Sequence, residues 1–305
     1  MKLALVFPGQ GSQSPGMLRG YAGIPGVHEA LEDAGRILGA EFTTLLDQGP
    51  AEQLDMTVNT QPAMLTGGYA AYLAWRALGG PEPEVVAGHS LGEYTALVAA
   101  GALKFADALP LVRFRAQAMQ EAVPAGQGAM AAILSLDEEK VRQACAEAGG
   151  VVQAVNFNSP EQIVIAGEKA AVQRASERCT ALGAKRAIPL PVSAPFHSTL
   201  MQPAGEKLRG YLAKVTIAAP KLRVVNNVDV KVETSPEAIR DALVRQASSP
   251  VRWVETIRAM RAQGVTHILE CGPGKALAGM VKRIDREIQT GSLNDRAAIE
   301  KALAK

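Results

Sequence analysis

The sequence predicts an α/β protein in which a mostly parallel sheet is interrupted by a small β-α-β-β-α-β segment. One observation is the apolar strand 84–87, which runs directly into the turn 88–92 and then into the helix-compatible run 93–100. The other is the rhythm of apolar residues, which changes from long helices to short strands between residues 126 and 192. We therefore expect a large domain, 1–125 with 193–305, and a small subdomain, 126–192.

Composition narrows the function classes. The chain has 305 residues, 48% of them hydrophobic and 20% charged, as in an ordinary globular enzyme. A net charge of +2 and the lack of a basic run with interleaved aromatics give no sign of nucleic-acid binding. No segment approaches the ~18 apolar residues of a membrane span. The 3 cysteines and 4 histidines are too scattered for a disulfide framework or a metal site. We expect a soluble cytoplasmic protein without a metal.

The N-terminal half alternates strands and helices. Residues 2–7 form an apolar strand, and the loop 8–13 that follows allows backbone amides to approach a ligand and presents Gln10. The G-x-G in this loop lacks the third glycine of a dinucleotide-binding motif, so we do not expect a nucleotide there. Helices are expected over residues 28–38, 60–78, 93–100 and 105–123.

The order of elements after residue 126 predicts a ferredoxin-like subdomain and then a return to the main domain. The subdomain's strands are expected at 130–136, 151–157, 162–166 and 186–192, and its helices at 137–148 and 169–182. In the main domain we expect helices at 200–213, 237–247 and 251–262, strands at 222–225, 228–232 and 265–270, and one C-terminal helix.

The turn Gly88-His89-Ser90-Leu91-Gly92 makes Ser90 the candidate nucleophile. The two glycines allow the strand and the helix to approach each other closely. The serine hydroxyl then projects from the end of the strand, and the Leu91 N–H points into the same space, where it can stabilise an oxyanion.

A serine nucleophile needs a base, and His197 is the candidate because it lies in a proline-containing loop at a domain junction. His28 lies within a helical pattern, and His89 adjoins the nucleophile, where packing of the turn is the simpler interpretation. His267 after Asp229 or Asp241 would fit the order of residues in α/β-hydrolases, but His267 is expected in the middle of a strand.

The acid of a catalytic triad is missing around His197. Between Ser90 and His197 the only aspartates are Asp107 and Asp137, and both are placed as helix N-caps. A Ser–His dyad oriented by a backbone carbonyl is the simplest alternative.

Helix 105–123 carries two arginines near its apolar stripe. Arg115 lies roughly 65° from the centre of the stripe and Arg113 roughly 95°, at 100° per residue. Arg115 is therefore better placed to point inward. On the pattern alone, two solvated arginines on a surface helix are an equal alternative.

Five motifs occur in the order and spacing of one family. They are F-P-G-Q-G-S-Q at 7–13, G-H-S-L-G-E-Y at 88–94, R-x-x-x-M-Q at 115–120, A-P-F-H at 194–197 and E-C-G-P-G at 270–274. Over nearly its whole length the chain resembles the malonyl-CoA:acyl carrier protein transacylases of bacterial fatty-acid synthesis. The resemblance implies an α/β-hydrolase-like large domain that carries a ferredoxin-like insertion.

The resemblance also implies the reaction. Members transfer the malonyl group from malonyl-CoA to the phosphopantetheine thiol of holo-acyl carrier protein, by a ping-pong mechanism through an ester on Ser90. The implied substrates are malonyl-CoA and the phosphopantetheinylated carrier, with no bound cofactor. We expect a monomer that binds the acyl carrier protein transiently and has no nucleic-acid or membrane partner.

Residue roles follow from the same resemblance. Ser90 matches the nucleophile and His197 the base, while Arg115 matches the arginine that pairs with the free malonyl carboxylate. The two oxyanion donors correspond to the backbone N–H groups of Gln10 and Leu91, and the carbonyl that orients the histidine corresponds to the main chain of Gln246.

Four further residues are weaker candidates. Phe196 resembles the bulky residue that excludes an α-methyl group in malonyl-selective relatives. Asn156 is a candidate lining residue of the acyl pocket, although strand-end packing explains it as well. Lys185 and Arg186 are candidates for docking CoA phosphates or the acidic carrier, although a solvated charge pair explains them equally.

Three rival functions remain open. They are a serine esterase or thioesterase, an acyltransferase that serves a polyketide pathway, and a binding protein that keeps the fold.

Overall fold

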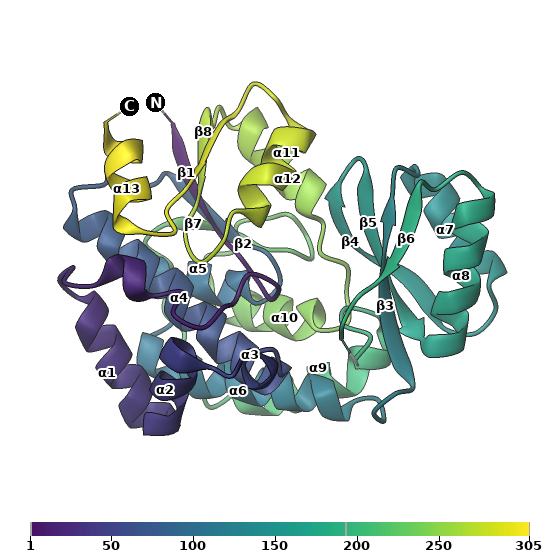
Figure 1. The fold of residues 1–305 in the computed structure, drawn as a ribbon, viewed down its shortest axis with the longest axis horizontal. Helices are drawn as coiled ribbons and strands as arrows, with labels where there is room; N and C mark the ends of the chain where they lie inside the picture. Colours follow the sequence, from purple (N-terminus) through teal and green to yellow (C-terminus); the bar gives the residue numbers. More distant parts are fainter. Residues whose placement is uncertain (1, 193, 305) are drawn as a thin grey trace.

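The main sheet has five strands that all run parallel. The structure, a computed structural model, describes residues 2–192 and 194–304. The strands are β1 (Leu3–Phe7), β2 (Val85–Gly88), β7 (Arg223–Val225), β8 (His267–Glu270) and β9 (Gln289–Ser292). Their order is β7-β2-β1-β8-β9, and each neighbouring pair is parallel (Figure 1). The carboxyl ends of all five strands therefore lie at one edge of the sheet, where α/β proteins place their sites.

Helices cover both faces of this sheet because successive strand residues point into two different cores. The helices outside the segment of the antiparallel sheet are α1 (Val27–Leu38), α2 (Ala40–Gln48), α3 (Ala51–Leu54), α4 (Thr57–Ala77), α5 (Gly92–Ala99), α6 (Phe105–Glu121), α9 (Gln202–Leu212), α10 (Pro236–Gln246), α11 (Trp253–Ala262), α12 (Ala276–Ile284) and α13 (Arg296–Leu303). Leu5 and Phe7 belong to a core shared with α1, α4, α5 and α6, whereas Ala4 and Val6 belong to a core shared with α11 and α12.

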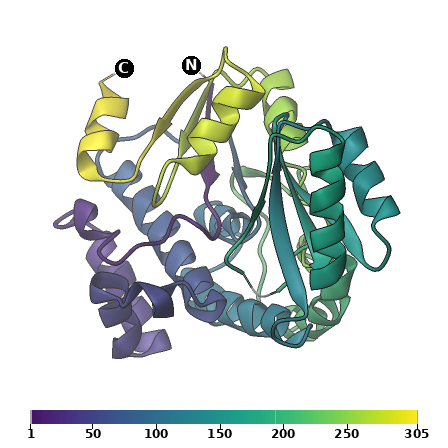
Figure 2. The same ribbon diagram turned by 45° about the vertical axis from the view of Figure 1, so that its right-hand side comes forward.

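A second sheet of four antiparallel strands lies at one end of the molecule. Its strands are β3 (Gly128–Leu134), β4 (Val152–Ser159), β5 (Gln162–Glu168) and β6 (Arg186–Pro189), and its helices are α7 (Glu138–Glu147) and α8 (Lys169–Ala181). The strand order is β4-β5-β3-β6. Both ribbon views show α7 and α8 on the face turned away from the parallel sheet (Figures 1 and 2).

Strand periodicity explains the two faces of this second sheet. Ile133 and Ile165 pack against α7 and α8 in one cluster of buried residues. Met130, Val155 and Val164 form a smaller cluster on the opposite face, together with residues of the chain that follows β6. This inner face is the one that meets the site described below.

Several expected elements differ in the structure. Residues 228–232 make only an isolated bridge, between Val225 and Val232, because Val230 has a φ of 58°, outside the strand region. Strand β6 ends at Pro189, since the Val192 N–H turns back to the Leu190 carbonyl. In addition, the C-terminal region contains β9 and α13 as well as the single expected helix, α12.

Two helices in the N-terminal half were not expected. Helices α2 and α3 have only 9 and 4 residues and are bounded by Gly39 and Pro50, so neither gives a long periodic pattern. The other predicted helices and strands are present, with bounds that shift by a few residues. Among the described residues, no helix combines the length and the hydropathy needed to cross a membrane.

Candidate active site

Ser90 lies in a strained turn between β2 and α5, where its φ is 52°. Glycine is required on both sides: a Cβ on Gly88 would lie 1.8 Å from the carbonyl carbon of Gly92, and a Cβ on Gly92 would lie 2.0 Å from the Phe7 carbonyl oxygen. Asn227 holds the turn, because its Oδ1 accepts from the Ser90 N–H at 2.7 Å and its Nδ2 donates to the Gly88 carbonyl at 2.7 Å. The turn therefore fixes the serine hydroxyl at the carboxyl edge of the sheet.

His197 contacts this hydroxyl directly. Its Nε2 lies 2.7 Å from Ser90 Oγ, and its Nδ1 lies 2.9 Å from the main-chain oxygen of Gln246. Because a carbonyl oxygen only accepts, Nδ1 carries the proton and Nε2 is free to accept the proton of the serine. Burial, and then the charge of Arg115, lower the pKa of His197 to about 3. The imidazole is therefore neutral at pH 7, and the pair has the geometry of a Ser–His dyad.

His267 lies at the opposite end of the parallel sheet. It pairs with Leu3 at the start of β1, whereas Gly88, just before Ser90, pairs with Phe7 at the end of β1. The two ends of the strand are about 13 Å apart at 3.3 Å per residue. His267 therefore cannot serve Ser90 as a base.

The aspartates proposed with His267 are engaged elsewhere. Asp229 accepts two hydrogen bonds from Arg245, at 2.9 and 2.7 Å, and Asp241 accepts a third from the same arginine at 2.6 Å. The alternative of a triad formed by Ser90, His267 and Asp229 or Asp241, in the residue order of α/β-hydrolases, is therefore wrong for this chain.

Arg115 points into the site from α6 and is only 1% exposed. Its Nη1 donates to Gln61 Oε1 at 2.7 Å, and its Nη2 donates to Gln246 Oε1 at 2.8 Å and to Ser90 Oγ at 3.2 Å. Its Nε is buried and has no partner among the described residues. Burial lowers the pKa of Arg115, but an arginine side chain stays charged in proteins. A guanidinium with a spare donor thus lies beside the nucleophile, and the interpretation of Arg115 as a solvated surface residue is wrong.

Three buried polar residues of the site were not singled out from the sequence. Gln61 and Asn227 give no local signal, because each acts through partners that are distant in the chain. Glu93 does give a local signal, because a carboxylate in an otherwise apolar helix indicates a buried polar contact; its side chain is 2% exposed. Burial raises the pKa of Glu93 to about 7.

Gln10 and Leu91 border the same cavity as Ser90. The loop that carries Gln10 approaches the serine turn so closely that a Cβ on Gly9 would lie 2.6 Å from the His89 carbonyl oxygen. Within the described residues, the backbone N–H groups of Gln10 and Leu91 donate to no acceptor. Both are therefore free to bind a ligand oxygen.

The cavity in front of Ser90 has a volume of about 120 Å³. Loops that follow β1 and β2 line it together with residues of β3 and β4. The lining residues are Gln10, Gln61, His89, Ser90, Leu91, Arg115, Met119, Met130, Asn156, Leu190, Val192, Phe196 and His197. A second cavity, of about 270 Å³, shares Gln10, Val192 and Phe196 with it. The site therefore has polar walls near Arg115 and apolar walls near β3 and the chain after β6.

Of the four weaker candidates from the sequence, two lie at the cavity and two lie away from it. Phe196 and Asn156 line the cavity, and the Oδ1 of Asn156 is buried without a partner among the described residues. Lys185 and Arg186 are exposed at the start of β6, away from the cavity, which the chain reaches only after β6 at Leu190. The structure thus brings the first pair to the site but not the second.

His89 packs beneath the turn as expected. Its Nε2 lies 2.7 Å from Asn158 Oδ1, and its ring meets Trp253 edge to face at 5.5 Å. Burial lowers its pKa. It has no contact with the serine hydroxyl and is a packing residue of the turn.

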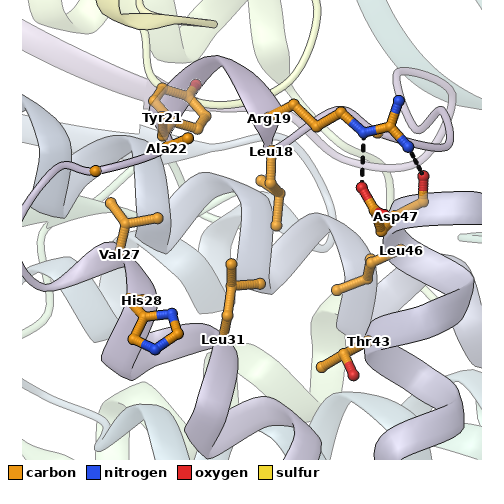
Figure 3. A pocket seen from close by; sticks show the side chains of 12 residues that line it. Leu18, Arg19, Tyr21, Ala22, Val27, His28, Leu31, Thr43, Leu46 and Asp47 are labelled. Atoms are coloured by element: carbon orange, nitrogen blue, oxygen red, sulfur yellow. Dashed lines mark hydrogen bonds and ion pairs between the residues drawn. The ribbon is translucent and has the colours of Figure 1, made fainter.

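A larger cavity, of about 320 Å³, lies between the 3₁₀ turn Arg19–Tyr21, α1 and α2 (Figure 3). Its wall is mainly aliphatic, and Arg19 is paired with Asp47 across its rim. His28 faces it from α1 but pairs with Glu32. Because its polar side chains are already engaged, this cavity lacks the reactive groups found around Ser90.

A serine paired with a neutral histidine at the carboxyl edge of a parallel sheet, with free backbone N–H groups beside it, defines an enzyme that transfers acyl groups through serine. The profile of one family, the acyl transferase domain, matches residues 4–294. The chain therefore belongs to the acyl transferase domain family, and it is an acyltransferase.

Named relatives cover the whole chain. It is 54% identical to the malonyl CoA-acyl carrier protein transacylase of Escherichia coli strain K12 over 99% of both chains. The corresponding protein of Bacillus subtilis strain 168 is 46% identical over 99% of this chain and 96% of its own. A crystal structure of the acyl-carrier-protein S-malonyltransferase from Burkholderia pseudomallei 1710b is 60% identical, with a TM-score of 0.98 over 100% of both chains. Another solved structure is described as a type II PKS acyl-carrier protein in complex with its malonyl-transacylase. A chain of this structure is 50% identical to the present chain, with a TM-score of 0.98 over 100% of this chain and 99% of that one.

Proposed function

We propose that this protein transfers the malonyl group of malonyl-CoA to the phosphopantetheine thiol of holo-acyl carrier protein, through an ester on Ser90. The observation that carries the proposal is the position of Ser90 Oγ, 2.7 Å from a neutral imidazole and 3.2 Å from a buried guanidinium. The imidazole provides a base for acyl transfer. The guanidinium provides a partner for an acyl group that carries its own carboxylate.

The first half-reaction loads the enzyme. His197 Nε2 takes the Ser90 proton as Oγ forms a bond to the thioester carbonyl carbon. The oxygen that becomes negative accepts hydrogen bonds from the N–H groups of Gln10 and Leu91. When the carbon–sulfur bond breaks, the CoA thiolate takes the proton back from His197. CoA leaves, and the malonyl ester remains on Ser90.

The second half-reaction runs the same steps in reverse with another thiol. The phosphopantetheine thiol of the carrier gives its proton to His197 and attacks the ester carbon, and Ser90 Oγ leaves with that proton. The carbonyl of Gln246 keeps the imidazole in the tautomer that both steps need. The reaction requires no cofactor.

Arg115 supplies the selectivity in this proposal. A buried carboxylate without a partner costs roughly 2–5 kcal/mol, which is about 1.5 to 3.5 powers of ten. The Nη2 donor that now faces Ser90 Oγ gives the guanidinium a hydrogen bond to offer to a malonyl carboxylate in the cavity. The apolar wall near Phe196 limits the space at the α-carbon, and Asn156 completes the acyl pocket.

The carrier belongs to a fatty-acid or a polyketide pathway. The relatives with acyl carrier protein in their names favour a carrier of this type as the partner. We place its docking near Lys185 and Arg186, which are exposed at the start of β6. A monomeric state and a cytoplasmic location stay predictions.

The proposal includes the division of the chain into a large α/β-hydrolase-like domain, 1–125 with 193–305, and a ferredoxin-like subdomain, 126–192. Two observations support it. The strand order β4-β5-β3-β6 is the one that a ferredoxin-like β-α-β-β-α-β unit adopts. The buried residues under α7 and α8 also form a cluster separate from those around the parallel sheet.

Two measurements test the proposal. Intact mass after incubation with malonyl-CoA should show one malonyl adduct on the enzyme and none on Ser90→Ala; an adduct on Ser90→Ala would refute the nucleophile. Labelled malonyl-CoA should then give labelled holo-carrier. If the label appears only as free malonate, at the same rate with and without carrier, the protein is a thioesterase and the transfer proposal fails.

A further inference from the structure

The side chain of Gln246 joins three groups of the site, apart from the main-chain contact with His197. Its Oε1 accepts from Arg115 Nη2 at 2.8 Å. Its Nε2 donates to the main-chain oxygen of Ser90 at 3.0 Å and to Glu93 Oε2 at 2.9 Å. The residue is fully buried, so these hydrogen bonds do not compete with water.

These partners fix which way the amide points. Arg115 can only donate, so it requires the amide oxygen, whereas the carboxylate of Glu93 and the Ser90 carbonyl require the amide nitrogen. A flipped amide would place two donors together at Arg115 and two acceptors together at Ser90 and at Glu93. The side chain of Gln246 therefore has one stable orientation, and in that orientation it holds one arm of the guanidinium beside the serine.

Glu93 holds the Gln246 side chain in this orientation. Its Oε2 accepts both from Gln246 Nε2 and from the Asn227 N–H, each at 2.9 Å. Asn227 in turn holds the backbone of the Ser90 turn. One carboxylate oxygen thus connects the support of the nucleophile with the support of the arginine.

We propose that the Gln246 side chain, anchored by Glu93, is a positioning element for Arg115 and thereby sets the preference for carboxylate-bearing acyl groups. This inference rests on the proposed malonyl transfer. It assigns Gln246 two separable tasks: the main-chain carbonyl orients the base, and the side chain orients the arginine. It assigns Glu93 a task that depends on its acceptor oxygen.

The two tasks can be separated because a substitution changes the side chain and leaves the carbonyl. Gln246→Met keeps a long unbranched side chain at the end of α10 and removes both polar atoms. Its matched control is Gln48→Met, at an exposed glutamine that ends α2. The readout is the rate of Ser90 acylation by malonyl-CoA and by acetyl-CoA in single turnover, which gives a selectivity ratio for each variant.

We expect Gln246→Met to lower kcat/KM for malonyl loading by about 10- to 100-fold, since Arg115 loses a charge-assisted hydrogen bond. Acetyl loading should fall much less than malonyl loading, because an acetyl group has no carboxylate for Arg115 to bind and Asn227 still holds the Ser90 turn. Gln48→Met should change neither. Equal losses for malonyl and acetyl groups would overturn the proposal, because they would mean that the side chain supports the base or the fold.

Glu93 variants test the anchor. Glu93→Gln keeps an oxygen that can accept from both donors and should retain the selectivity ratio within about threefold. Glu93→Met removes that oxygen and should shift the ratio in the same direction as Gln246→Met. If Glu93→Gln loses as much selectivity as Glu93→Met, the anchoring role is wrong.

Arg115→Ala separates this inference from the proposed function. If Arg115→Ala leaves the selectivity ratio unchanged, the proposed recognition of the carboxylate fails. If Arg115→Ala changes the ratio and Gln246→Met does not, only the positioning role fails. With both substitutions combined, we expect the ratio of Arg115→Ala alone; additive losses would contradict a side chain that acts through the arginine.

Discussion

The two sheets contribute to the active site in different ways. The parallel sheet and its loops bring polar groups to one point. There, Ser90 Oγ lies within hydrogen-bonding distance of both His197 and Arg115, and Arg115 also donates to Gln246. The antiparallel sheet faces the same cavity with Met130 and the half-buried Asn156, and the chain after β6 adds Leu190 and Val192. In the proposed mechanism, one side thus supplies the reacting and recognising groups, and the other supplies mainly shape.

The difference lies in how each side is held. On the polar side, Ser90 and His197 both have positive φ, 52° and 65°, and are kept there by hydrogen bonds from distant segments. Such conformations cost free energy and persist only where the surroundings enforce them. On the apolar side, β3 follows ordinary alternation past Met130, whereas the register of β4 shifts between Ala154 and Asn156. Substitutions of Ser90 or His197 should therefore abolish chemistry, whereas those of Arg115 and of the apolar side should adjust the choice of substrate.

The largest effect should come from His197→Ala. We expect a loss of about 10² to 10⁴ in the rate of Ser90 acylation, since a positioned general base contributes about that much. His267→Ala, at the other end of the sheet, is the matched control and should leave the rate within about twofold. The measurement is single-turnover loading from malonyl-CoA, and a larger defect in His267→Ala would contradict the site.

Arg115→Ala should come next. Malonyl loading should fall by about 1.5 to 3.5 powers of ten, because a buried carboxylate loses its partner at a cost of roughly 2–5 kcal/mol. Acetyl loading should survive or rise. Competition between malonyl-CoA and acetyl-CoA, followed by intact mass, reports the ratio; a parallel loss of both adducts would mean that Arg115 supports the fold and has no role in selectivity.

A change on the apolar side should alter selectivity while largely sparing the rate. Phe196→Ala should raise methylmalonyl loading relative to malonyl by about tenfold, since room for one methyl group is worth roughly 10- to 200-fold. Phe114→Ala is the control, because Phe114 stacks on Tyr211 at 4.6 Å and does not line the cavity. An unchanged ratio in Phe196→Ala would show that another residue limits the space.

The smallest effect should be that of mild acid on loading. Burial lowers the pKa of His197 to about 3, so the base stays neutral well below pH 6. Single-turnover loading should be flat between pH 8 and 5.5, whereas an unperturbed histidine would lose about tenfold over that range. An acid limb centred near pH 6.5 would contradict the assignment.

The same lowered pKa has a consequence for stability. Because the unfolded chain binds a proton on this histidine below about pH 6.5 and the folded chain does not until about pH 3, the contribution of His197 to stability is present above pH 6.5 and is lost as the pH falls.

Local features in the sequence were enough for much of the fold. The glycines at 88 and 92 specify the tight turn by themselves, because a side chain at either position would overlap the backbone. Apolar periodicity likewise located most strands and the long helices α4 and α6. It failed where an element is short, as in α3, or where one residue has a positive φ, as at Val230. The position of Arg115 relative to the apolar stripe was a correct indication that it points inward, but the pattern alone did not decide this.

The sequence by itself therefore determined the turn at Ser90, the order of the elements and the two kinds of sheet, and it predicted Ser90 as the nucleophile, since these depend on residues that are close in the chain. Only the tertiary structure decided which histidine contacts Ser90, because His197 is 107 positions away and competed with His267 on the pattern. Only the tertiary structure showed that the Gln246 side chain and the carboxylate of Glu93 belong to the same hydrogen-bond network as Arg115. Gln246 is 156 positions from Ser90 in the chain. Such contacts depend on where folding brings distant segments together, and no local pattern encodes them.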